Sequence, residues 1–215
     1  MCAASYDCRT TPRSTGSMDR HIRKARRDEL LAQIMELVLA NGFTRTRTDD
    51  LASWLGCSKA TLYGIAVGKV PLVASVLRKF LSDAVKLAEQ NIADLTDPAA
   101  RVRAYLTVIG METRRISPAC YRDMMDYDLT SDVYRGHAEA MAGKLREQIR
   151  DGVRVGCFRP LHPEFLAEAV NLIAHANQDG QLPSRAGLTL ADAQGHLTDL
   201  VVATLTNTAY QHRPS

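Results

Sequence analysis

Apolar residues recur every three or four positions along most of the chain, and this spacing constrains the fold more than any other feature. Leu30, Ile34 and Val38 follow one another at intervals of four, and comparable stripes continue toward the C-terminus. We find no run that alternates apolar and polar residues, as a half-buried strand would. Most prolines and glycines stand at the ends of the periodic stretches. Because breakers and periodicity agree, the sequence predicts an all-α protein.

Capping signals mark where the first helices begin and end. Asn41-Gly42 predicts a helix end, because both residues tolerate the left-handed cap conformation. Thr48 is expected to cap the next helix, ahead of Asp49-Asp50, whose charges suit a helix N-terminus. Gly56 ends that helix, and Ser58 is expected to cap a short one from Lys59 to about Ile65. Residues 48–65 therefore predict two short helices joined by a tight turn.

The remaining chain predicts longer helices. One long stretch is expected over 72–92, and Asp97-Pro98 and Ser117-Pro118 each combine an N-cap residue with proline at the first helical position. Further helices are expected from about Asp132 to Val155 and from Pro163 to about Ala176. Thr189 opens the last helix with Asp192 as its capping-box partner. The polar segment 178–187 contains glycine and proline and is expected to be a loop.

Charge is distributed unevenly over the 215 residues. Residues 1–80 contain 13 Lys/Arg and 7 Asp/Glu, whereas residues 81–215 contain 14 and 17. The N-terminal 1–18 are polar and are expected to be a disordered tail, and five basic residues follow between Asp19 and Arg27. A basic front end joined to a mildly acidic remainder predicts an anionic partner for the first third only.

The cysteine spacing and the lengths of the apolar runs indicate the cellular compartment. Five widely spaced cysteines without a CxxC motif or zinc-ligand spacing predict reduced thiols and no metal site. No apolar signal-peptide core and no apolar run of about 20 residues is present. We therefore expect a cytoplasmic protein without a membrane span, and no cofactor.

The segment 48–65 reads TDDLASWLGCSKATLYGI and has the spacing of a helix-turn-helix. In that motif the first helix packs on the second, which presents its N-terminal residues to the DNA major groove. Leu51, Leu55 and Leu62 are placed to hold the pair together. The opposite face offers hydroxyl and ammonium donors, which suit phosphate oxygens and base edges, from Ser58, Lys59, Thr61 and Tyr63.

Over about 45 residues, from Leu30 to Leu72, the sequence resembles the TetR family of transcription regulators. The resemblance includes Asn41-Gly42-Phe43, Leu55-Gly56 and Ser58–Tyr63. It implies an N-terminal three-helix DNA-binding domain (19–70) with the helix-turn-helix, followed by a larger helical domain for ligand binding and dimerisation (71–215). It further implies DNA contacts from Lys59, Thr61 and Tyr63, and phosphate contacts from Thr48 and Lys69. Arg45 and Arg47, which precede the motif, are candidates for further phosphate contacts or are solvated loop charges.

The sequence departs from the family after Tyr63. The family usually has an aromatic or His there and, two residues later, Phe, whereas this chain has Gly64-Ile65-Ala66. Losing the Phe should cost packing unless Ile65 or Val67 fills the space. The departure leaves open a second function, a TetR-like ligand-binding or scaffold protein with weakened DNA binding.

The C-terminal part predicts a homodimer built from the last two helices. One stripe contains Phe165, Ala169, Leu172, Ile173 and Ala176, and the last helix repeats apolar residues at Leu190, Ala193, Leu197, Leu200, Val201, Thr204 and Leu205. Two such helices from each chain would form a four-helix interface across a twofold axis. Packing within one monomer is the alternative.

A ligand pocket is expected among the middle helices, since Met and aromatic side chains make adaptable apolar cavities. The candidate liners are Tyr105, Met111, Met124, Met125, Tyr127, Tyr134, His137, Met141, Phe158 and Asn171. Ordinary core packing is the alternative for each of them, and His137 and His175 are typical of structural histidines. The expected function is a repressor that a small, largely apolar effector releases from a palindromic operator.

A catalytic function is the least favoured interpretation. The sequence contains no G-x-S-x-G, no HExxH and no glycine-rich phosphate loop, so no catalytic residue is expected. Three carboxylates cluster at Asp123, Asp126 and Asp128, but their spacing matches no known catalytic site. A solvated turn explains the cluster.

Overall fold

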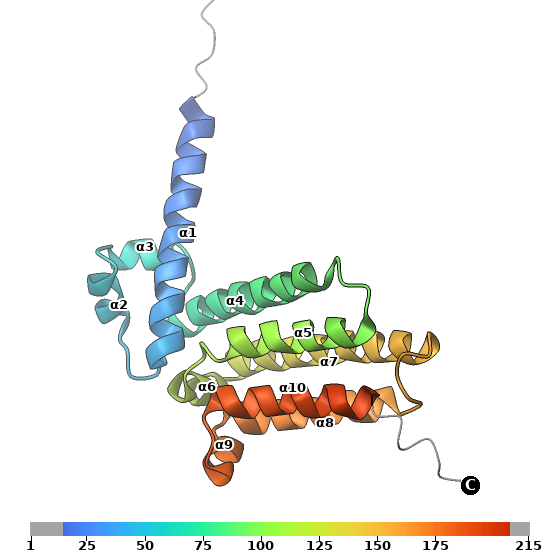
Figure 1. The fold of residues 1–215 in the computed structure, drawn as a ribbon. Helices are drawn as coiled ribbons and strands as arrows, with labels where there is room; N and C mark the ends of the chain where they lie inside the picture. The colour runs from blue at the N-terminus through green and yellow to red at the C-terminus, as the bar shows by residue number, and fades with distance from the viewer. Residues whose placement is uncertain (1–14, 207–215) are drawn as a thin grey trace, which may run out of the picture.

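The computed structural model describes the backbone of residues 15–206 and the side chains of residues 25–206. This part of the chain forms ten α-helices and no strand, which confirms the all-α prediction (Figure 1). The helices are α1 Thr15–Asn41, α2 Thr48–Trp54, α3 Lys59–Tyr63, α4 Lys69–Ile92, α5 Pro98–Thr113, α6 Pro118–Met125, α7 Asp128–Arg154, α8 Pro163–Gln178, α9 Gln181–Ala186 and α10 Leu190–Thr206.

Most helix boundaries stand where the capping signals placed them. Gly42 follows α1 with a φ of 75°, a left-handed conformation that glycine adopts without strain. The side chains of Asp97 and Ser117 accept hydrogen bonds from the backbone N–H groups of the third helical residues of α5 and α6. Thr189 and Asp192 form the expected capping box at the start of α10.

Four boundary predictions were wrong. Helix α2 is capped by Arg47 instead of Thr48, because the Asp50 carboxylate accepts the Arg47 N–H at 3.0 Å and so draws one more residue into the helix. Helix α7 begins at Asp128, four residues before the expected start, and α4 begins at Lys69 directly after Gly68. The expected loop 178–187 contains the short helix α9.

The predicted tail over residues 1–18 lies largely outside the described residues. Its last four residues, Thr15 to Met18, belong to α1. No proline or glycine other than Gly16 interrupts this stretch, and a helix that is already nucleated gains one hydrogen bond for each residue added at its end.

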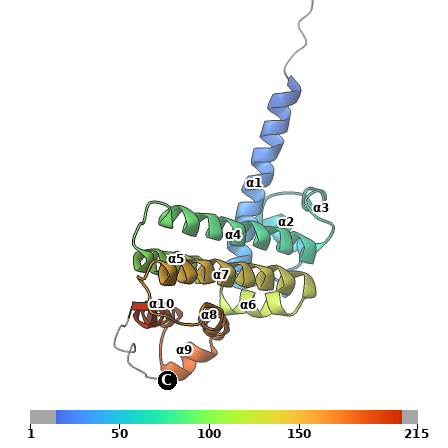
Figure 2. The same cartoon turned by 90° about the vertical axis from the view of Figure 1, so that its right-hand side faces the viewer.

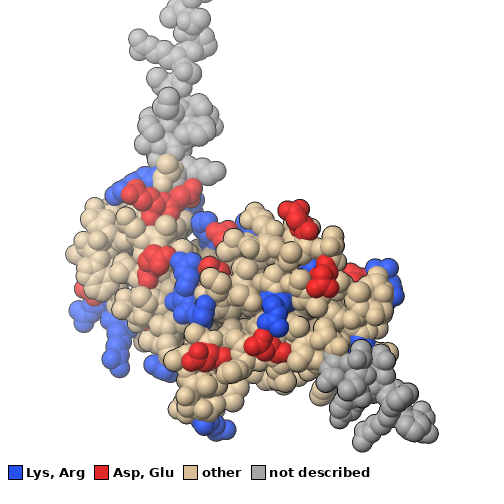
Figure 3. Space-filling model, viewed as in Figure 1, with Lys and Arg blue, Asp and Glu red and all other residues tan. Residues whose placement is uncertain are grey.

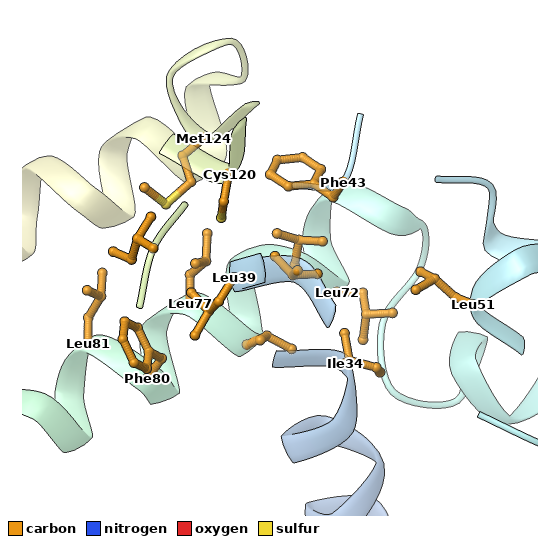
Figure 4. Packing of buried hydrophobic residues seen from close by; sticks show 14 of the residues in the cluster. Ile34, Leu39, Phe43, Leu51, Leu72, Leu77, Phe80, Leu81, Cys120 and Met124 are labelled. Atoms are coloured by element: carbon orange, nitrogen blue, oxygen red, sulfur yellow. The ribbon is translucent and has the colours of Figure 1, made fainter. Parts of the chain in front are cut away.

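A first hydrophobic core joins the helix-turn-helix to the rest of the molecule. It contains side chains of α1, α2, α3 and the first half of α4, and it also includes Ile116, Cys120 and Met124 from α6 and the segment before it. Figure 4 shows Leu39 and Phe43 at the end of α1 beside Cys120 and Met124. The N-terminal helices therefore pack on α6 through a shared hydrophobic core.

A second core lies between the long helices of the C-terminal part. Ala88 and Ile92 from the end of α4 pack there with α5, α7, α8 and α10. In Figures 1 and 2 these helices form stacked layers, with α4 above α5 and α7, and α8 and α10 below. Because α4 contributes to both cores, it fixes the helix-turn-helix relative to the larger helical body. None of the helices described is long and apolar enough to cross a membrane.

Candidate nucleic-acid interface and ligand cavity

The predicted helix-turn-helix is formed by α2, the turn Leu55–Cys57 and α3. Gly56 has a φ of 57° in the turn, a conformation that a side chain would strain. Leu51, Leu55 and Leu62 are all buried in the first core, as their spacing predicted. Ser58 caps α3, with its side-chain oxygen accepting the Thr61 N–H at 3.1 Å. Helix α3 is thus fixed at its N-terminus and along its inner face.

The side chains that the sequence predicts to contact DNA lie on the outer face of α3. Ser58, Lys59, Thr61 and Tyr63 are all exposed, and half of the Tyr63 surface is accessible. The hydroxyls of Ser58 and Thr61 lie 3.0 Å apart and share a hydrogen bond. The Lys59 ammonium pairs with the Asp49 carboxylate of α2. Figure 3 shows Lys and Arg side chains at the left-hand end of the molecule, where α2 and α3 lie.

Lys69 has partners that its sequence position did not reveal. Its ammonium donates to the carbonyl oxygens of Thr44 and Thr46, both at 3.0 Å. These bonds tie the start of α4 to the loop after α1 and leave one N–H of the ammonium for a further acceptor. Arg45 and Arg47 are exposed, and Thr48 is half-buried in the first turn of α2.

The segment after Tyr63 shows how the chain replaces the missing Phe. Ile65 and Ala66 are half-buried and pack against the first core, whereas Val67 is 89% exposed. Ile65 therefore takes the packing role, and Val67 does not. Gly64 ends α3 in an ordinary helical conformation, with φ −66° and ψ −18°. Gly68 has a φ of 105°, which glycine alone adopts readily, and it allows the sharp entry into α4.

Asp123 links α6 to the loop that follows α1. One of its carboxylate oxygens accepts the backbone N–H groups of Phe43 and Thr44 at 2.5 and 2.7 Å. The Ser117 N–H donates to the Leu39 carbonyl at 2.9 Å, which makes a second link to the end of α1. The interpretation of Asp123 as part of a solvated turn was wrong, because its partners lie 80 residues away in the sequence.

A cavity lies between α5, α7, α8 and α10 in the larger helical body. Five of the ten predicted liners surround it: Tyr105, Tyr134, His137, Met141 and Asn171. The other five lie elsewhere. Met124 is buried in the first core, Met125 and Tyr127 pack against that core, Phe158 is buried in the second core against Gly152, and Met111 is 54% exposed. Residue type predicted which side chains suit a cavity, but it did not predict which face of each helix points to the cavity.

The cavity also has liners that the sequence reasoning missed. They include Thr113, His175, Gln178 and Gln194. His175 and Gln178 are separated from Asn171 by one and two helical turns, so the i, i+4, i+7 spacing along α8 was the available signal. His175 Nδ1 lies 3.1 Å from the Tyr121 hydroxyl, and Gln178 Nε2 donates to the Ile116 carbonyl at 2.8 Å. Both side chains therefore connect the cavity to α6 and the segment before it.

Helices α8 and α10 leave apolar side chains on the surface. Phe165 and Leu172 of α8 are 74% and 68% exposed, and Leu200 of α10 is 58% exposed. The rest of the α10 stripe faces inward, because Ala193, Leu197, Val201 and Leu205 are buried in this chain. Packing within one monomer thus explains most of that stripe but not Leu200.

Among the described residues, no group of three His, Cys, Asp or Glu side chains is arranged to hold a metal ion. Cys57, Cys120 and Cys157 are free thiols, and Cys2 and Cys8 lie outside the described residues.

Comparison with known proteins identifies the fold. No family model matches the chain, and no curated protein matches it. Several solved structures do match over most of their length. A transcriptional regulator from Saccharomonospora viridis, solved in complex with choline, has a TM-score of 0.70 at 20% identity, covering 86% of this chain and 98% of its own.

Two further structures have the same arrangement. A TetR regulator from Haloarcula marismortui has a TM-score of 0.70 at 20% identity, covering 85% of this chain and 99% of its own. A TetR-family regulator from Syntrophomonas wolfei has a TM-score of 0.69 at 14% identity, covering 88% and 99%. These matches agree with the resemblance carried by residues 30–72 and with the geometry of the helix-turn-helix. The chain therefore has the fold of the TetR-family transcriptional regulators.

Proposed function

We propose that this protein is a DNA-binding transcription regulator that acts as a homodimer and responds to a small molecule. The observation that carries the proposal is the exposed face of α3. Four side chains able to contact phosphates or base edges stand together on a helix that is capped at Ser58 and held by Leu62. Arg45 and Arg47 in the loop before α2, Thr48 in the first turn of α2 and Lys69 at the start of α4 would supply phosphate contacts. We propose no catalytic role for any residue.

The Lys59–Asp49 pair affects how this face would meet DNA. Lys59 must exchange the Asp49 carboxylate for a phosphate or a base edge, and the carboxylate then remains close to an anionic partner. Exposed ion pairs are worth at most about 1 kcal/mol, so the exchange is readily reversible. Lys69 keeps its two carbonyl partners and would reach a phosphate with its remaining N–H.

Dimerisation would use the exposed side chains of α8 and α10. Helices α8 and α10 pack against each other, and the exposed side chains of Phe165, Leu172 and Leu200 would be removed from water by contact with a second copy. A twofold dimer presents two copies of α3, which would bind two half-sites about one helical turn of DNA apart.

The ligand response would pass through α6. A molecule in the cavity contacts His175 and Gln178, which are hydrogen bonded to Tyr121 and to the carbonyl before α6. At its other side α6 holds the end of α1 through Asp123. A shift of α6 would move the helix-turn-helix relative to its partner copy and so change the half-site spacing. We propose repression relieved in this way by a small, largely apolar effector, within the cytoplasm.

Selection of DNA fragments tests the proposal. The purified protein is incubated with sheared genomic DNA at low salt, and the retained fragments are sequenced. We expect enrichment of an inverted repeat, which the Lys59→Ala/Tyr63→Ala double variant fails to enrich while keeping the wild-type melting temperature. Absence of enrichment by the wild-type protein would overturn the proposal and leave a ligand-binding or scaffold protein of the same fold.

A further inference from the structure

We propose that the cavity between α5, α7, α8 and α10 takes a compact, uncharged molecule that carries a hydroxyl or carbonyl group, and that it rejects ions of the same shape. The inference names the ligand class and rests on the proposed function only for the role of the cavity as the effector site. It is carried by the absence of charged side chains from the lining and by a buried hydroxyl that lacks a protein partner.

No Lys, Arg, Asp or Glu is among the described residues that line the cavity. Its walls are largely aliphatic, with Leu106, Ile109, Leu145, Val170 and Leu197 among them. An ion that enters such a site loses its hydration and gains no counter-charge, which is far more costly than burial of a neutral group. The lining therefore selects against both carboxylates and cations.

Tyr105 provides the polar group that a neutral ligand can use. It is completely buried, and its hydroxyl has no hydrogen-bond partner among the described residues. Burial raises the pKa of Tyr105 well above its usual value, and the carboxylates of Glu89 and Glu147 raise it further, so the hydroxyl keeps its proton. A ligand oxygen that accepts a hydrogen bond from this hydroxyl satisfies a donor that would otherwise stay unpaired, whereas a pure hydrocarbon does not.

His137 is another polar residue on the lining with an unpartnered atom, and it is uncharged as well. Its Nε2 atom is buried without a partner among the described residues, and burial lowers the pKa of the imidazole to about 4. At neutral pH it can exchange a hydrogen bond with a hydroxyl, but it offers no positive charge to a carboxylate.

A cation finds no aromatic cage here. Aromatic faces bind quaternary ammonium ions when several of them are open to the ligand. The Tyr134 ring already makes edge contacts with Tyr121 and His175, at centroid distances of 5.3 Å each. The lining has no carboxylate to pair with a cation. The Tyr105 ring alone would therefore have to offset the free energy that a cation loses with its hydration.

The size of the cavity limits the ligand further. Its volume is about 70 Å³, and an engineered cavity of about 150 Å³ binds benzene in another protein. A ligand the size of benzene therefore already requires the helices to move outward, so the cavity favours compact molecules over larger ones.

Three molecules of one shape test the inference. In 3,3-dimethyl-1-butanol, choline and 3,3-dimethylbutanoate the same branched skeleton is neutral, cationic or anionic. Binding to the full-length protein is measured by isothermal calorimetry at pH 7.5 without DNA. We expect the alcohol to bind at least tenfold more tightly than either ion. Equal or tighter binding of either ion, or no binding of the alcohol at millimolar concentration, overturns the inference.

Variants locate the site and separate it from the DNA question. Tyr105→Phe removes only the unpaired hydroxyl and should weaken alcohol binding at least fivefold without lowering the melting temperature. Tyr127→Phe, at a tyrosine outside the cavity, is the matched control and should leave the affinity unchanged. Equal affinities of wild type and Tyr105→Phe would show that Tyr105 does not hold the ligand and would contradict the inference. Because DNA is absent, failed fragment selection and failed alcohol binding are independent results.

Discussion

At the scale of single residues, the candidate DNA-binding face combines an ammonium with an acid that competes for it. Lys59 and Asp49 are both exposed, yet their side chains are paired between α3 and α2. The sequence identified Lys59 from its position in the motif, and it identified Asp49 only as a favourable first-turn acid. The pairing depends on how α2 crosses α3, which spacing along the chain does not specify.

Asp49→Asn is expected to strengthen DNA binding about two- to fivefold, because the change frees Lys59 and removes one negative charge beside the phosphates. The measurement is fluorescence anisotropy with a selected duplex at fixed salt. Asp94→Asn, at an exposed acid near the far end of α4, changes the net charge equally and should have little effect. Weaker binding by Asp49→Asn would mean that the acid positions Lys59 productively.

His137 predicts a dependence of stability on pH. Burial lowers its pKa to about 4, from about 6.5 for a histidine in water, so the unfolded chain binds more protons than the folded chain between these values. Stability is therefore complete above about pH 6.5 and falls as the pH drops toward 4, by about 2 kcal/mol at pH 5. His137→Asn should lose this part of the pH dependence, as measured by urea unfolding at pH 7.5 and pH 5. An equal loss in both proteins would show that His137 is not the group responsible.

At the scale of elements, local signals predicted the helix ends better than the helix faces. Pro98 and Pro118 with their caps, and glycine after α1 and α2, marked boundaries because capping is decided within one turn of chain. Helix α9 was missed because Gln181–Ala186 is flanked by two left-handed glycines and contains Pro183, which together are typical of a loop. Its formation depends on packing of Pro183 in the folded chain, where that residue is buried.

Only half of the predicted cavity liners were correct, for a related reason. Residue type indicated which side chains suit a pocket, but Met111 and Met141 differ only in the face of their helix that meets other helices. Met141 points to the space between α7 and α5, whereas Met111 lies on the surface. Similarly, Asp123 and Asp126 look alike in the sequence, and only the packing of α6 against α1 gives Asp123 its two backbone donors.

Asp123→Ala is expected to lower the free energy of unfolding by about 2 kcal/mol, because two backbone N–H groups lose a charged acceptor. Urea unfolding followed by circular dichroism measures the change. Asp126→Ala, at an exposed acid three residues away, is the matched control and should change stability by less than about 0.5 kcal/mol. Similar losses in both variants would argue that helix charge, and not the link to α1, is what Asp123 provides.

At the scale of the whole molecule, α4 and α6 tie the helix-turn-helix to the helical body through a continuous core. Leu72 to Leu81 of α4 belong to the first core, and Ala88 and Ile92 of the same helix belong to the second. The predicted boundary after residue 70 falls at the first turn of α4, so a cut there would expose buried side chains of both parts. The two regions are expected to unfold together.

The dimer is the second property at this scale. Leu172→Glu combined with Leu200→Glu should yield a monomer, since each change places a charge in the proposed apolar interface. Analytical ultracentrifugation measures the mass of wild type and variant at equal concentration. Leu87→Glu, at a partly exposed leucine of α4, adds the same charge elsewhere and should leave the dimer intact. A double variant that stays dimeric would place the interface on another surface.

The most direct test of the account is the affinity of this protein for its selected DNA fragment as a function of salt. Anisotropy titrations between 50 and 200 mM NaCl should give a slope of log K against log salt of about −6 or steeper, because a dimer that neutralises several phosphates at each half-site releases that many counterions. The Lys59→Ala/Tyr63→Ala variant should lose at least tenfold in affinity at every salt concentration. Undetectable binding of the wild type at the lowest salt, or an affinity unaffected by the two substitutions, would contradict the claim that α3 grips DNA.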